Sequence, residues 1–302
     1  MASSRRSCLS VPGSSAKMLA KAQGLAADEV VIDLEDSVPP DGKDDARVTA
    51  AKAVSEGSWE GRSVAVRINS TSTPWGARDV AHLVEEAGEA LTCLVVPKVQ
   101  SADELRAVDR LLDGEEERVG RERPVGLQAL VETAAGLCAA REIAGASDRL
   151  EALIIGYADL AASLGCQMAA DYPGDRWHWV RETVLVAARS AGRQAIDGPH
   201  LEVGDLDGLE VEARRAYALG FDGKWALHPS QVEPLNEVFS PRQEDVDRAA
   251  AILDALAAGE REGGRGAVML DGEMIDEASR KLAVQVVARA EAAGMSPGVD
   301  SS

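Results

Sequence analysis

The 302-residue sequence has few cysteines, few aromatic residues and no long apolar run. Its four cysteines lie far apart, without the close spacing of a zinc site or a disulfide framework: Cys8, Cys93, Cys138 and Cys166. We expect them to be small buried hydrophobic residues. No stretch of roughly 18 apolar residues occurs, and residues 1–6 are not followed by the apolar segment of a secretory signal. These absences favour a soluble, cytoplasmic protein.

Positive charge is also scarce, because 51 acidic residues face 32 lysines and arginines, giving a net charge of −19. Non-specific binding to nucleic acid or to an anionic membrane needs a basic surface, so the composition argues against both partners. An anionic small molecule stays possible, since a few arginines can dominate one pocket. With 45% hydrophobic and 3% aromatic residues, the core is expected to consist of Ala, Val, Leu and Ile, as in α/β proteins.

Short apolar runs alternate with segments of helical periodicity through the first two-thirds of the chain. The runs predict strands at 8–11, 30–34, 64–68, 91–96, 125–131 and 153–156, with weaker candidates at 194–196 and 223–227. Helical segments include one starting at Ser14 or Ser15, one at 79–90 and one at 134–143. Eight repeated strand–helix units imply a parallel sheet and favour its closure. The fold class predicted for residues 1–240 is therefore a (β/α)8 TIM barrel.

The pattern changes around Ser240, and residues 241–302 are expected to form a C-terminal helical lid. Ser240 resembles an N-cap, with Pro241 at the first helical position and Gln243 at the third, and the helix should run to about residue 258. The segment is too small to fold alone. We expect it to dock on its own barrel or on that of a neighbouring subunit.

One carboxylate of this lid has two possible roles. The Gly-rich residues 262–266 suggest a flexible hinge, and Asp271–Gly272 predicts a type I′ hairpin turn. Asp276 follows this hairpin and directly precedes a last helix at 277–293. It is either the N-cap of that helix or, carried on a hinged element, a general acid or base.

Glu132 and Asp159 are the candidate metal ligands. Glu132 directly follows the strand predicted at 125–131, and Asp159 follows the next one. In a parallel barrel both would lie at the carboxyl ends of the strands, where such barrels carry their chemistry. Two carboxylates without neighbouring Cys or His suit a hard cation such as Mg²⁺. The alternative is two ordinary surface acids.

Further charged residues follow the earlier strands. Asp33, Glu35 and Asp36 come after the second strand, either as turn and capping residues or as an outer shell that orients an arginine. Arg67 emerges from the third strand and needs a partner, either a substrate carboxylate or enolate oxygen or a salt bridge to those acids. Lys98 places another cation after the fourth strand.

Three other basic residues stay ambiguous. Lys43 and Arg47, on the helix after the acidic loop, either hold phosphates at the barrel rim or are solvated charges. His228 ends the last strand, as a structural hydrogen-bonding residue or as a base. Arg6 precedes the first strand and should lie near the opposite face of the barrel.

Taken together, these segments resemble the citrate lyase beta subunit-like (HpcH/HpaI aldolase) superfamily. The resemblance rests on eight stretches in series: 6–13, 33–38 with Lys43 and Arg47, 66–70, 96–99, 131–136, 155–160, 220–231 and 271–276. They span nearly the whole chain.

The resemblance implies a TIM barrel with a C-terminal lid, assembled as trimers or hexamers in which each lid covers a neighbour's site. By the same resemblance, Glu132 and Asp159 bind Mg²⁺, and Arg67 and Glu132 contact the keto or hydroxy acid. Asp276 would be the catalytic acid or base, and Lys43 and Arg47 would hold the nucleotide of coenzyme A.

The implied activity is a Mg²⁺-dependent carbon–carbon lyase that cleaves malyl- or citramalyl-coenzyme A by reversible Claisen-type chemistry. The alternatives are a malyl-coenzyme A thioesterase, a malate synthase-like enzyme, or the citryl-carrier-protein lyase subunit of a larger complex. The His228–Pro229 ending and the flanking Gly223–Trp225 are more similar to members that use free coenzyme A. The sequence departs from the family in lacking a proline soon after Asp276, which affects the expected lid geometry and the balance between hydrolysis and cleavage.

Overall fold

The computed structural model describes residues 4–59, 62–167, 174–263 and 266–298. The chain divides into two compact units, Met1–Glu237 and Val238–Ser302. The boundary expected from sequence lay between residues 240 and 241. Residues 264–265 of the expected Gly-rich hinge lie outside the described residues.

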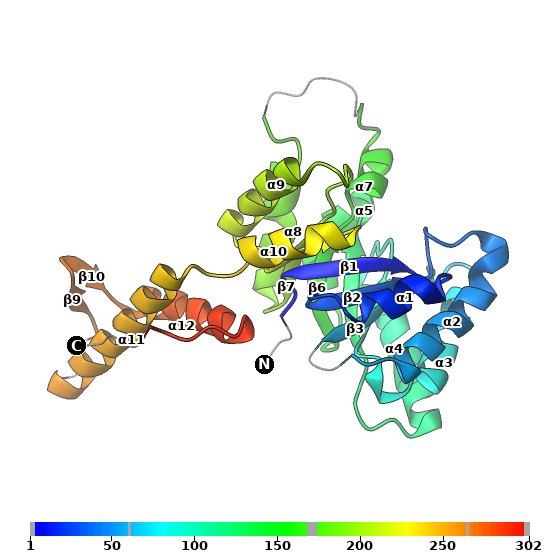
Figure 1. Ribbon diagram of the computed structural model, residues 1–302, viewed down its shortest axis with the longest axis horizontal. Helices are drawn as coiled ribbons and strands as arrows, with labels where there is room; N and C mark the ends of the chain where they lie inside the picture. The colour runs from blue at the N-terminus through cyan, green and yellow to red at the C-terminus, as the bar shows by residue number, and fades with distance from the viewer. Residues whose placement is uncertain (1–3, 60–61, 168–173, 264–265, 299–302) are drawn as a thin grey trace. The chain divides into compact units, whose positions relative to one another are not determined.

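The first unit is a closed barrel of eight parallel strands in sequential order, in which β1 pairs with both β2 and β8 (Figure 1). The strands are β1 (Ser7–Pro12), β2 (Glu29–Asp33), β3 (Ser63–Arg67), β4 (Cys93–Val96), β5 (Gly126–Val131), β6 (Leu150–Ile155), β7 (Gln194–Asp197) and β8 (Gly223–Ala226). The TIM-barrel prediction is confirmed, including the two strands whose sequence signal was weak.

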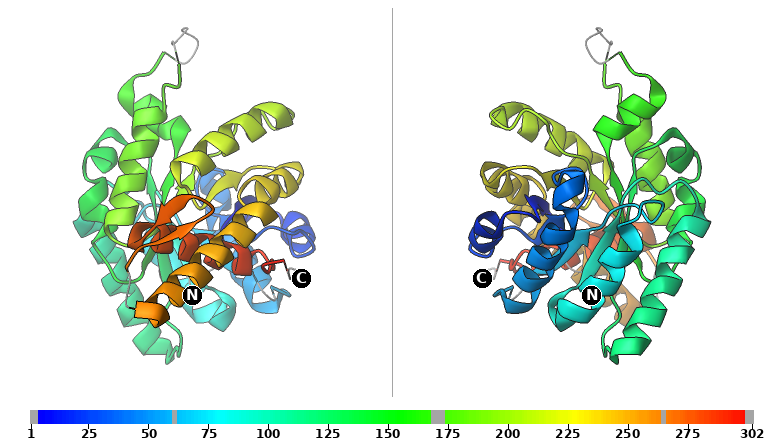
Figure 2. Two further views of the ribbon diagram at one scale, coloured as in Figure 1. Left: turned by 90° about the vertical axis from the view of Figure 1, so that its left-hand side faces the viewer. Right: turned by 90° about the vertical axis from the view of Figure 1, so that its right-hand side faces the viewer.

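Helices surround the strands of this unit (Figure 2). They are α1 (Ala16–Ala22), α2 (Lys43–Glu56), α3 (Gly76–Glu86), α4 (Ala102–Val119), α5 (Ala134–Cys138), α6 (Ala140–Ala144), α7 (Tyr157–Leu164), α8 (His178–Ser190), α9 (Leu206–Leu219) and α10 (Val232–Val238). Three 3₁₀ turns lie at Pro40–Gly42, Gly88–Ala90 and Pro229–Gln231.

In the first unit, two helices differ from the sequence prediction in their boundaries. The helix expected at 79–90 begins at Gly76 and ends at Glu86, because Gly88 takes a left-handed φ of 62° and starts a 3₁₀ turn. The helix expected at 134–143 is two short helices, interrupted at Ala139. The start of α1 is confirmed, since the Ser15 side chain accepts a hydrogen bond from the Met18 N–H.

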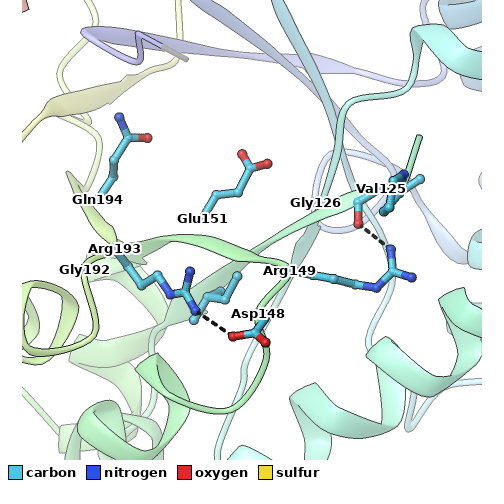
Figure 3. Close-up of a pocket in the computed structure, with 10 residues that line it drawn as sticks. Val125, Gly126, Asp148, Arg149, Glu151, Gly192, Arg193 and Gln194 are labelled. Carbon is cyan, nitrogen blue, oxygen red and sulfur yellow. Dashed lines mark hydrogen bonds and ion pairs between the residues drawn. The ribbon is translucent and has the colours of Figure 1, made fainter. Parts of the chain in front are cut away.

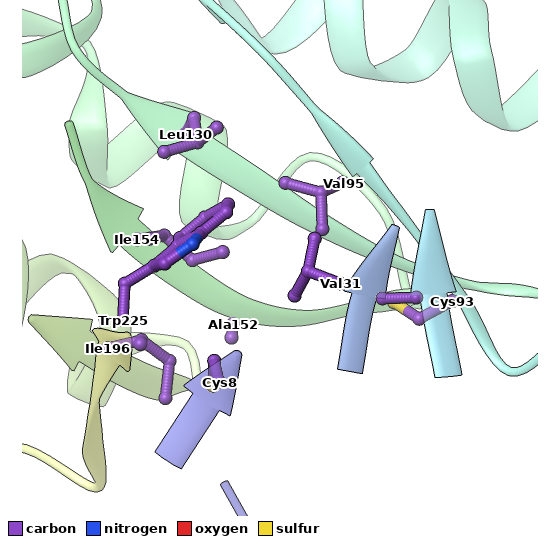
Figure 4. Packing of buried hydrophobic residues seen from close by; sticks show 10 residues of the cluster. Cys8, Val31, Cys93, Val95, Leu130, Ala152, Ile154, Ile196 and Trp225 are labelled. Carbon is purple, nitrogen blue, oxygen red and sulfur yellow. The ribbon is translucent and has the colours of Figure 1, made fainter. Parts of the chain in front are cut away.

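The barrel interior contains apolar side chains contributed by all eight strands. Figure 4 shows Trp225 of β8 lying among Leu130, Ile154 and Ile196. Cys8 and Cys93 belong to this core, as expected. For Cys138 the expectation was wrong, because this residue lies on the exposed side of the short helix α5, and Cys166 is only partly buried.

Polar residues occupy the amino-terminal end of the barrel. The Arg5 guanidinium donates to the Glu29 carboxylate over 2.8 Å, and the Gln128 amide donates to both oxygens of that carboxylate. All three side chains are buried. Arg6 lies at the same end and pairs with Asp28, which agrees with its expected place opposite the candidate site.

The second unit contains α11 (Gln243–Gly263), a hairpin of β9 (Val268–Leu270) and β10 (Glu273–Ile275), and α12 (Glu277–Ala292). The hairpin turn at Asp271 and Gly272 has positive φ at both residues, as a type I′ turn requires. Among the residues that the structure describes, no helix combines the length and apolarity needed to cross a membrane.

The predicted start of α11 was wrong. The helix begins at Gln243, and the N–H groups of Asp245 and Val246 bond to the Arg242 carbonyl. Glu244 and Asp245 therefore occupy the first turn, where acidic side chains interact favourably with the helix dipole. The helix also extends past the predicted residue 258.

Candidate active site

The carboxyl ends of the strands bring Glu132 and Asp159 to one cavity. Glu132 directly follows β5, and Asp159 lies in the first turn of α7, after β6. Both line a cavity of about 150 Å³, together with Ser10, Arg67 and Trp225. The structure thus brings the two carboxylates together, and their role as metal ligands stays a prediction.

Glu132 is almost completely buried, with an exposed fraction of 2%. Burial raises the pKa of its carboxyl to about 7, although the Lys98 N–H, which donates to Oε1 over 2.7 Å, acts in the opposite direction. The carboxylate lies against Gly156: a Cβ at that position would be 2.3 Å from Oε2 of Glu132. Sequence reasoning missed Gly156, because the need for a glycine at this position comes from Glu132, which is its neighbour in space but not in sequence.

Arg67 is held by the acids that follow β2. Its Nε and Nη2 donate to the two carboxylate oxygens of Asp33, each over 2.7 Å, and Nη1 lies 3.3 Å from Glu35. Burial by itself would lower the pKa of Arg67, but hydrogen bonds and charge from Asp33 raise this pKa above its usual range. The expected salt bridge is present. The guanidinium also lines the cavity, 5.8 Å from the centre of the Trp225 ring.

Lys98 contacts both candidate metal ligands. Its ammonium bonds to Glu35 and lies 3.5 Å from Asp36 and 3.7 Å from Oδ2 of Asp159. Burial by itself would lower the pKa of Lys98, yet these acids raise it above its usual range. The site therefore contains two cations, Arg67 and Lys98, among five carboxylates.

Glu132 and Asp159 fit a Mg²⁺ ion. Within the described ranges, no group of three or more His, Cys, Asp or Glu side chains is arranged as a closed metal site. Mg²⁺ needs no such group, because it commonly binds one or two carboxylates and fills its other positions with water or substrate oxygens. A buried carboxylate whose pKa is raised, beside a second one in an open cavity, is a donor set that a hard cation would stabilise.

A larger cavity, of about 740 Å³, lies beside the first and shares Asp36 with it. The loops after β2, β3 and β4 form it, and Lys43, Lys98, Trp75 and several hydroxyl residues line it. The Lys43 ammonium donates to the carbonyls of Leu34 and Glu35, over 3.0 and 2.9 Å. Lys43 thus borders a space large enough for part of an extended ligand.

Arg47 is engaged by the protein itself. Its Nε donates to Asp79 over 2.6 Å, and Asp79 also accepts hydrogen bonds from the backbone and side chain of Asn69. Since Arg47 and Lys43 are both 7% exposed, the alternative that they are ordinary solvated charges is wrong. The expectation that they hold a nucleotide stays a prediction.

Two other candidates act as caps. His228 accepts a hydrogen bond from the Ser230 N–H at Nδ1 and caps the 3₁₀ turn after β8, as expected for a structural residue. In the second unit, Oδ1 of Asp276 accepts from the N–H groups of Ala278 and Ser279. Asp276 is thus the N-cap of α12, and its possible role as an acid or base stays a prediction.

Sequence reasoning also missed a buried network behind the cavity. The Asp197 carboxylate, at the end of β7, accepts from the Tyr157 hydroxyl and lies 2.6 Å from the Lys224 ammonium. Asp197 and Lys224 are both fully buried. Because Tyr157 begins the helix that carries Asp159, the network fixes the loop after β6 to the two following strands.

A third cavity lies at the amino-terminal ends of β5, β6 and β7. Figure 3 shows Glu151 and Gln194 beside it, with Arg193 directed at Asp148 and Arg149 at the Val125 carbonyl. None of the predicted site residues lines this cavity. The candidate active site is therefore at the carboxyl-terminal end of the barrel.

Comparison with known proteins identifies the family of this chain. The family model of HpcH/HpaI aldolase/citrate lyase matches residues 6–229. The chain belongs to the HpcH/HpaI aldolase/citrate lyase family. An L-malyl-CoA/beta-methylmalyl-CoA lyase of Cereibacter sphaeroides is 39% identical over 295 residues, covering 93% of this chain and 92% of that protein. A (3S)-malyl-CoA thioesterase of the same species is 37% identical, covering 95% of each chain.

Solved structures of family members are also similar. CitE from Mycobacterium tuberculosis, in complex with magnesium, acetoacetate and coenzyme A, has a TM-score of 0.74 and 34% identity, covering 96% of this chain and 98% of that one. A citrate lyase of Burkholderia xenovorans, at 22% identity, has a TM-score of 0.83 over 97% of this chain and 94% of its own, which supports the fold.

Proposed function

We propose that this protein is a Mg²⁺-dependent carbon–carbon lyase that cleaves a 3-hydroxyacyl-coenzyme A with a free carboxylate, such as malyl- or citramalyl-coenzyme A. The observation that carries the proposal is the cavity that Glu132, Asp159 and Arg67 line together at the carboxyl end of the barrel. The family and the lyase relatives support it.

In this proposal, Glu132 and Asp159 hold the Mg²⁺ ion, which when bound supplies a Lewis acid for the substrate's carboxylate and hydroxyl oxygens. A base removes the proton of the substrate hydroxyl, the carbon–carbon bond breaks, and the hydroxyl carbon becomes the keto group of the product. Arg67, fixed by Asp33, stabilises the negative charge that develops in this step. Asp276 exchanges a proton with the enolate carbon of the leaving thioester. Oδ1 of Asp276 is used by the helix cap, so Oδ2 is the oxygen that takes part.

The coenzyme A part of the substrate would occupy the cavity of about 740 Å³ that borders the site. Lys43 lies on its wall, and its positive charge favours a phosphate group there. Arg47, one helical turn away, is paired with Asp44 and Asp79, so its part in this proposal is to hold the helix that carries Lys43.

A thioesterase is the second candidate, because a (3S)-malyl-CoA thioesterase is almost as similar to this chain as the lyases are. The same residues would then serve attack of water on the thioester. The two functions differ in their products: cleavage yields a keto acid and an acyl-coenzyme A, whereas hydrolysis yields a free hydroxy acid and coenzyme A.

The proposal includes a cytoplasmic enzyme that assembles as a homotrimer or a hexamer, with the second unit of each chain covering a neighbour's site. The hairpin of the second unit exposes the side chains of Met269 and Met274. Exposed apolar side chains of this kind support docking of the unit on another protein surface.

The test is turnover of malyl- and citramalyl-coenzyme A with and without Mg²⁺, resolving keto acid from free hydroxy acid. We expect Mg²⁺-dependent formation of glyoxylate or pyruvate by the natural protein. Glu132→Gln and Asp159→Asn keep the side-chain shape but remove the charge, so both should lose Mg²⁺ binding and turnover while the barrel stays folded.

Asp103→Asn is the control, since Asp103 is an exposed acid on α4 that pairs only with Arg106 in the described chain. It should behave like the natural protein. Full Mg²⁺-dependent activity in Glu132→Gln or Asp159→Asn would contradict the metal assignment, and free malate or citramalate as the product would favour the thioesterase.

A further inference from the structure

Lys98 adopts a backbone conformation that is unusual for a lysine. It follows β4 and Pro97, and its φ is 53°, in the left-handed region that residues with a side chain rarely occupy. The other residue of this kind in the described chain is Asp271, in the hairpin turn. Such a conformation costs free energy and persists where surrounding contacts hold it.

The contacts that hold Lys98 involve both candidate metal ligands. The backbone N–H donates to Oε1 of Glu132 over 2.7 Å. The side chain turns to the acids, where its ammonium bonds to Glu35 and lies 3.7 Å from Oδ2 of Asp159. Among the described residues, no other cation lies within 4.0 Å of Asp159.

The ammonium of Lys98 and a divalent cation would interact with the same carboxylate. Two cations that share Asp159 repel one another, and the repulsion is strong in a half-buried site. Arg67 is committed to Asp33 by two hydrogen bonds and cannot take the place of Lys98. The charge of Lys98 therefore opposes the binding of a metal ion beside it.

We propose that Lys98 is an internal competitor of the metal, which weakens the binding of Mg²⁺ to Glu132 and Asp159 until an anionic substrate enters. This inference rests on the proposed metal site. A keto-acid carboxylate adds negative charge to the site, so it compensates for the ammonium of Lys98. Mg²⁺ and the keto acid then bind cooperatively, and each raises the affinity of the other by the same factor.

Titration calorimetry of Mg²⁺ into the chelator-treated full-length protein, without substrate, tests the proposal. Lys98→Met removes the charge and keeps most of the side-chain volume. Lys98→Gly also removes the charge, but it keeps the N–H that donates to Glu132 and relaxes the left-handed backbone. We expect both variants to bind Mg²⁺ about tenfold or more tightly than the natural protein. Lys98→Arg, which keeps the charge, should stay near the natural affinity.

The same titrations with pyruvate present measure the coupling. In the natural protein pyruvate should strengthen Mg²⁺ binding by a larger factor than in Lys98→Met, because the variant has no ammonium for the keto acid to compensate. Lys52→Met is the matched control: it removes one positive charge from the exposed face of α2 and should leave both titrations unchanged.

A purely structural role for Lys98 predicts the opposite sign, since misplaced carboxylates bind metal more weakly. If both Lys98→Met and Lys98→Gly bind Mg²⁺ as weakly as the natural protein or more weakly, the inference about Lys98 is wrong, whereas the proposed function is unaffected. Absence of Mg²⁺ binding both by the natural protein with pyruvate present and by Lys98→Met would overturn the proposed function, and the inference with it. If Lys98→Met fails to fold, Lys98→Gly decides, because glycine tolerates a φ of 53° without strain.

Discussion

Glu132 depends on a neighbour that has no side chain. The glutamate comes from the end of β5, and Gly156 follows β6, so the two adjacent strands bring them together. Gly156 has an ordinary negative φ of −106°, which other residues adopt freely. Its requirement is therefore steric: the Glu132 carboxylate occupies the space in which a methyl group at position 156 would lie.

We predict that Gly156→Ala displaces Glu132 and weakens Mg²⁺ binding. The new Cβ would lie 2.3 Å from Oε2 and 2.6 Å from Cβ of Glu132. Overpacking of this kind against a buried side chain costs about 1–3 kcal/mol. Mg²⁺ titration and denaturant unfolding measure the two effects.

Gly114→Ala is the control for this substitution. Gly114 lies inside α4, and a methyl group at this position would have open space around it, with nothing within 4 Å. Alanine there should stabilise the protein by roughly 0.5–1 kcal/mol. Natural Mg²⁺ affinity in Gly156→Ala would show that Glu132 does not need its observed position to bind metal.

Sequence reasoning found the site residues that stand in a local pattern, and it missed those that depend on contacts in space. Glu132, Asp159 and Arg67 stand at the ends of apolar runs, so local pattern is enough to place them at one end of a barrel. Gly156 and the left-handed Lys98 owe their importance to contacts across strands. No spacing along the chain reports such contacts.

Among the elements, the short hairpin and α12 were predicted well because their signals are local. Asp271–Gly272 specifies a tight turn, and Asp276 directly precedes a helical pattern. The start of α11 was predicted too early, because Ser240 and Pro241 have the residue types of a helix start without forming one.

We predict that Asp276→Ser separates the two roles of this residue. Serine is a good N-cap, so the variant should keep the thermal stability of the natural protein, whereas Asp276→Ala should lose about 1 kcal/mol. Both variants lack a carboxylate and should lose turnover by about 10²–10⁴-fold. Thermal unfolding and steady-state kinetics on the same preparations give both readouts.

The pattern of the results decides between the roles. Loss of turnover in both variants, with stability lost only in Asp276→Ala, supports an acid or base. Turnover that follows stability, so that Asp276→Ser stays active, would leave Asp276 as a cap alone.

Across the whole barrel, the repeated pattern of strands and helices was visible in the sequence because each unit is local. The polar network at the amino-terminal end was not, since Arg5, Glu29 and Gln128 lie far apart in the chain and meet only when the barrel closes. The same holds for the Tyr157, Asp197 and Lys224 network. Closure therefore joins Arg5, Glu29 and Gln128 at the amino-terminal end of the barrel, and it brings Glu132, Asp159 and Arg67 to one cavity at the carboxyl-terminal end.

The acids that closure pairs with arginines should make the barrel sensitive to acid. Asp28 is an example at the amino-terminal end. Burial by itself would raise the pKa of its carboxyl, but hydrogen bonds from Arg6 and Ser4 and the charge of Arg6 lower this pKa. A carboxyl whose pKa is lower in the folded state stabilises the fold above its unfolded value of about 3.9. This contribution is lost as the pH falls through the folded pKa.

We therefore predict that Asp28→Asn lowers the free energy of unfolding by about 1–3 kcal/mol at pH 7, because the charged hydrogen bonds to Arg6 are lost. The difference between the variant and the natural protein should shrink below about pH 4, where the Asp28 carboxylate of the natural protein takes up its proton. Urea unfolding at several pH values measures it, and the exposed Asp103→Asn should show little difference at any pH. The contrary outcome is a difference between variant and natural protein that stays constant down to about pH 2, where the carboxylate has lost its charge. Asp28 would then stabilise the fold through its shape and neutral hydrogen bonds, and its charge would contribute nothing.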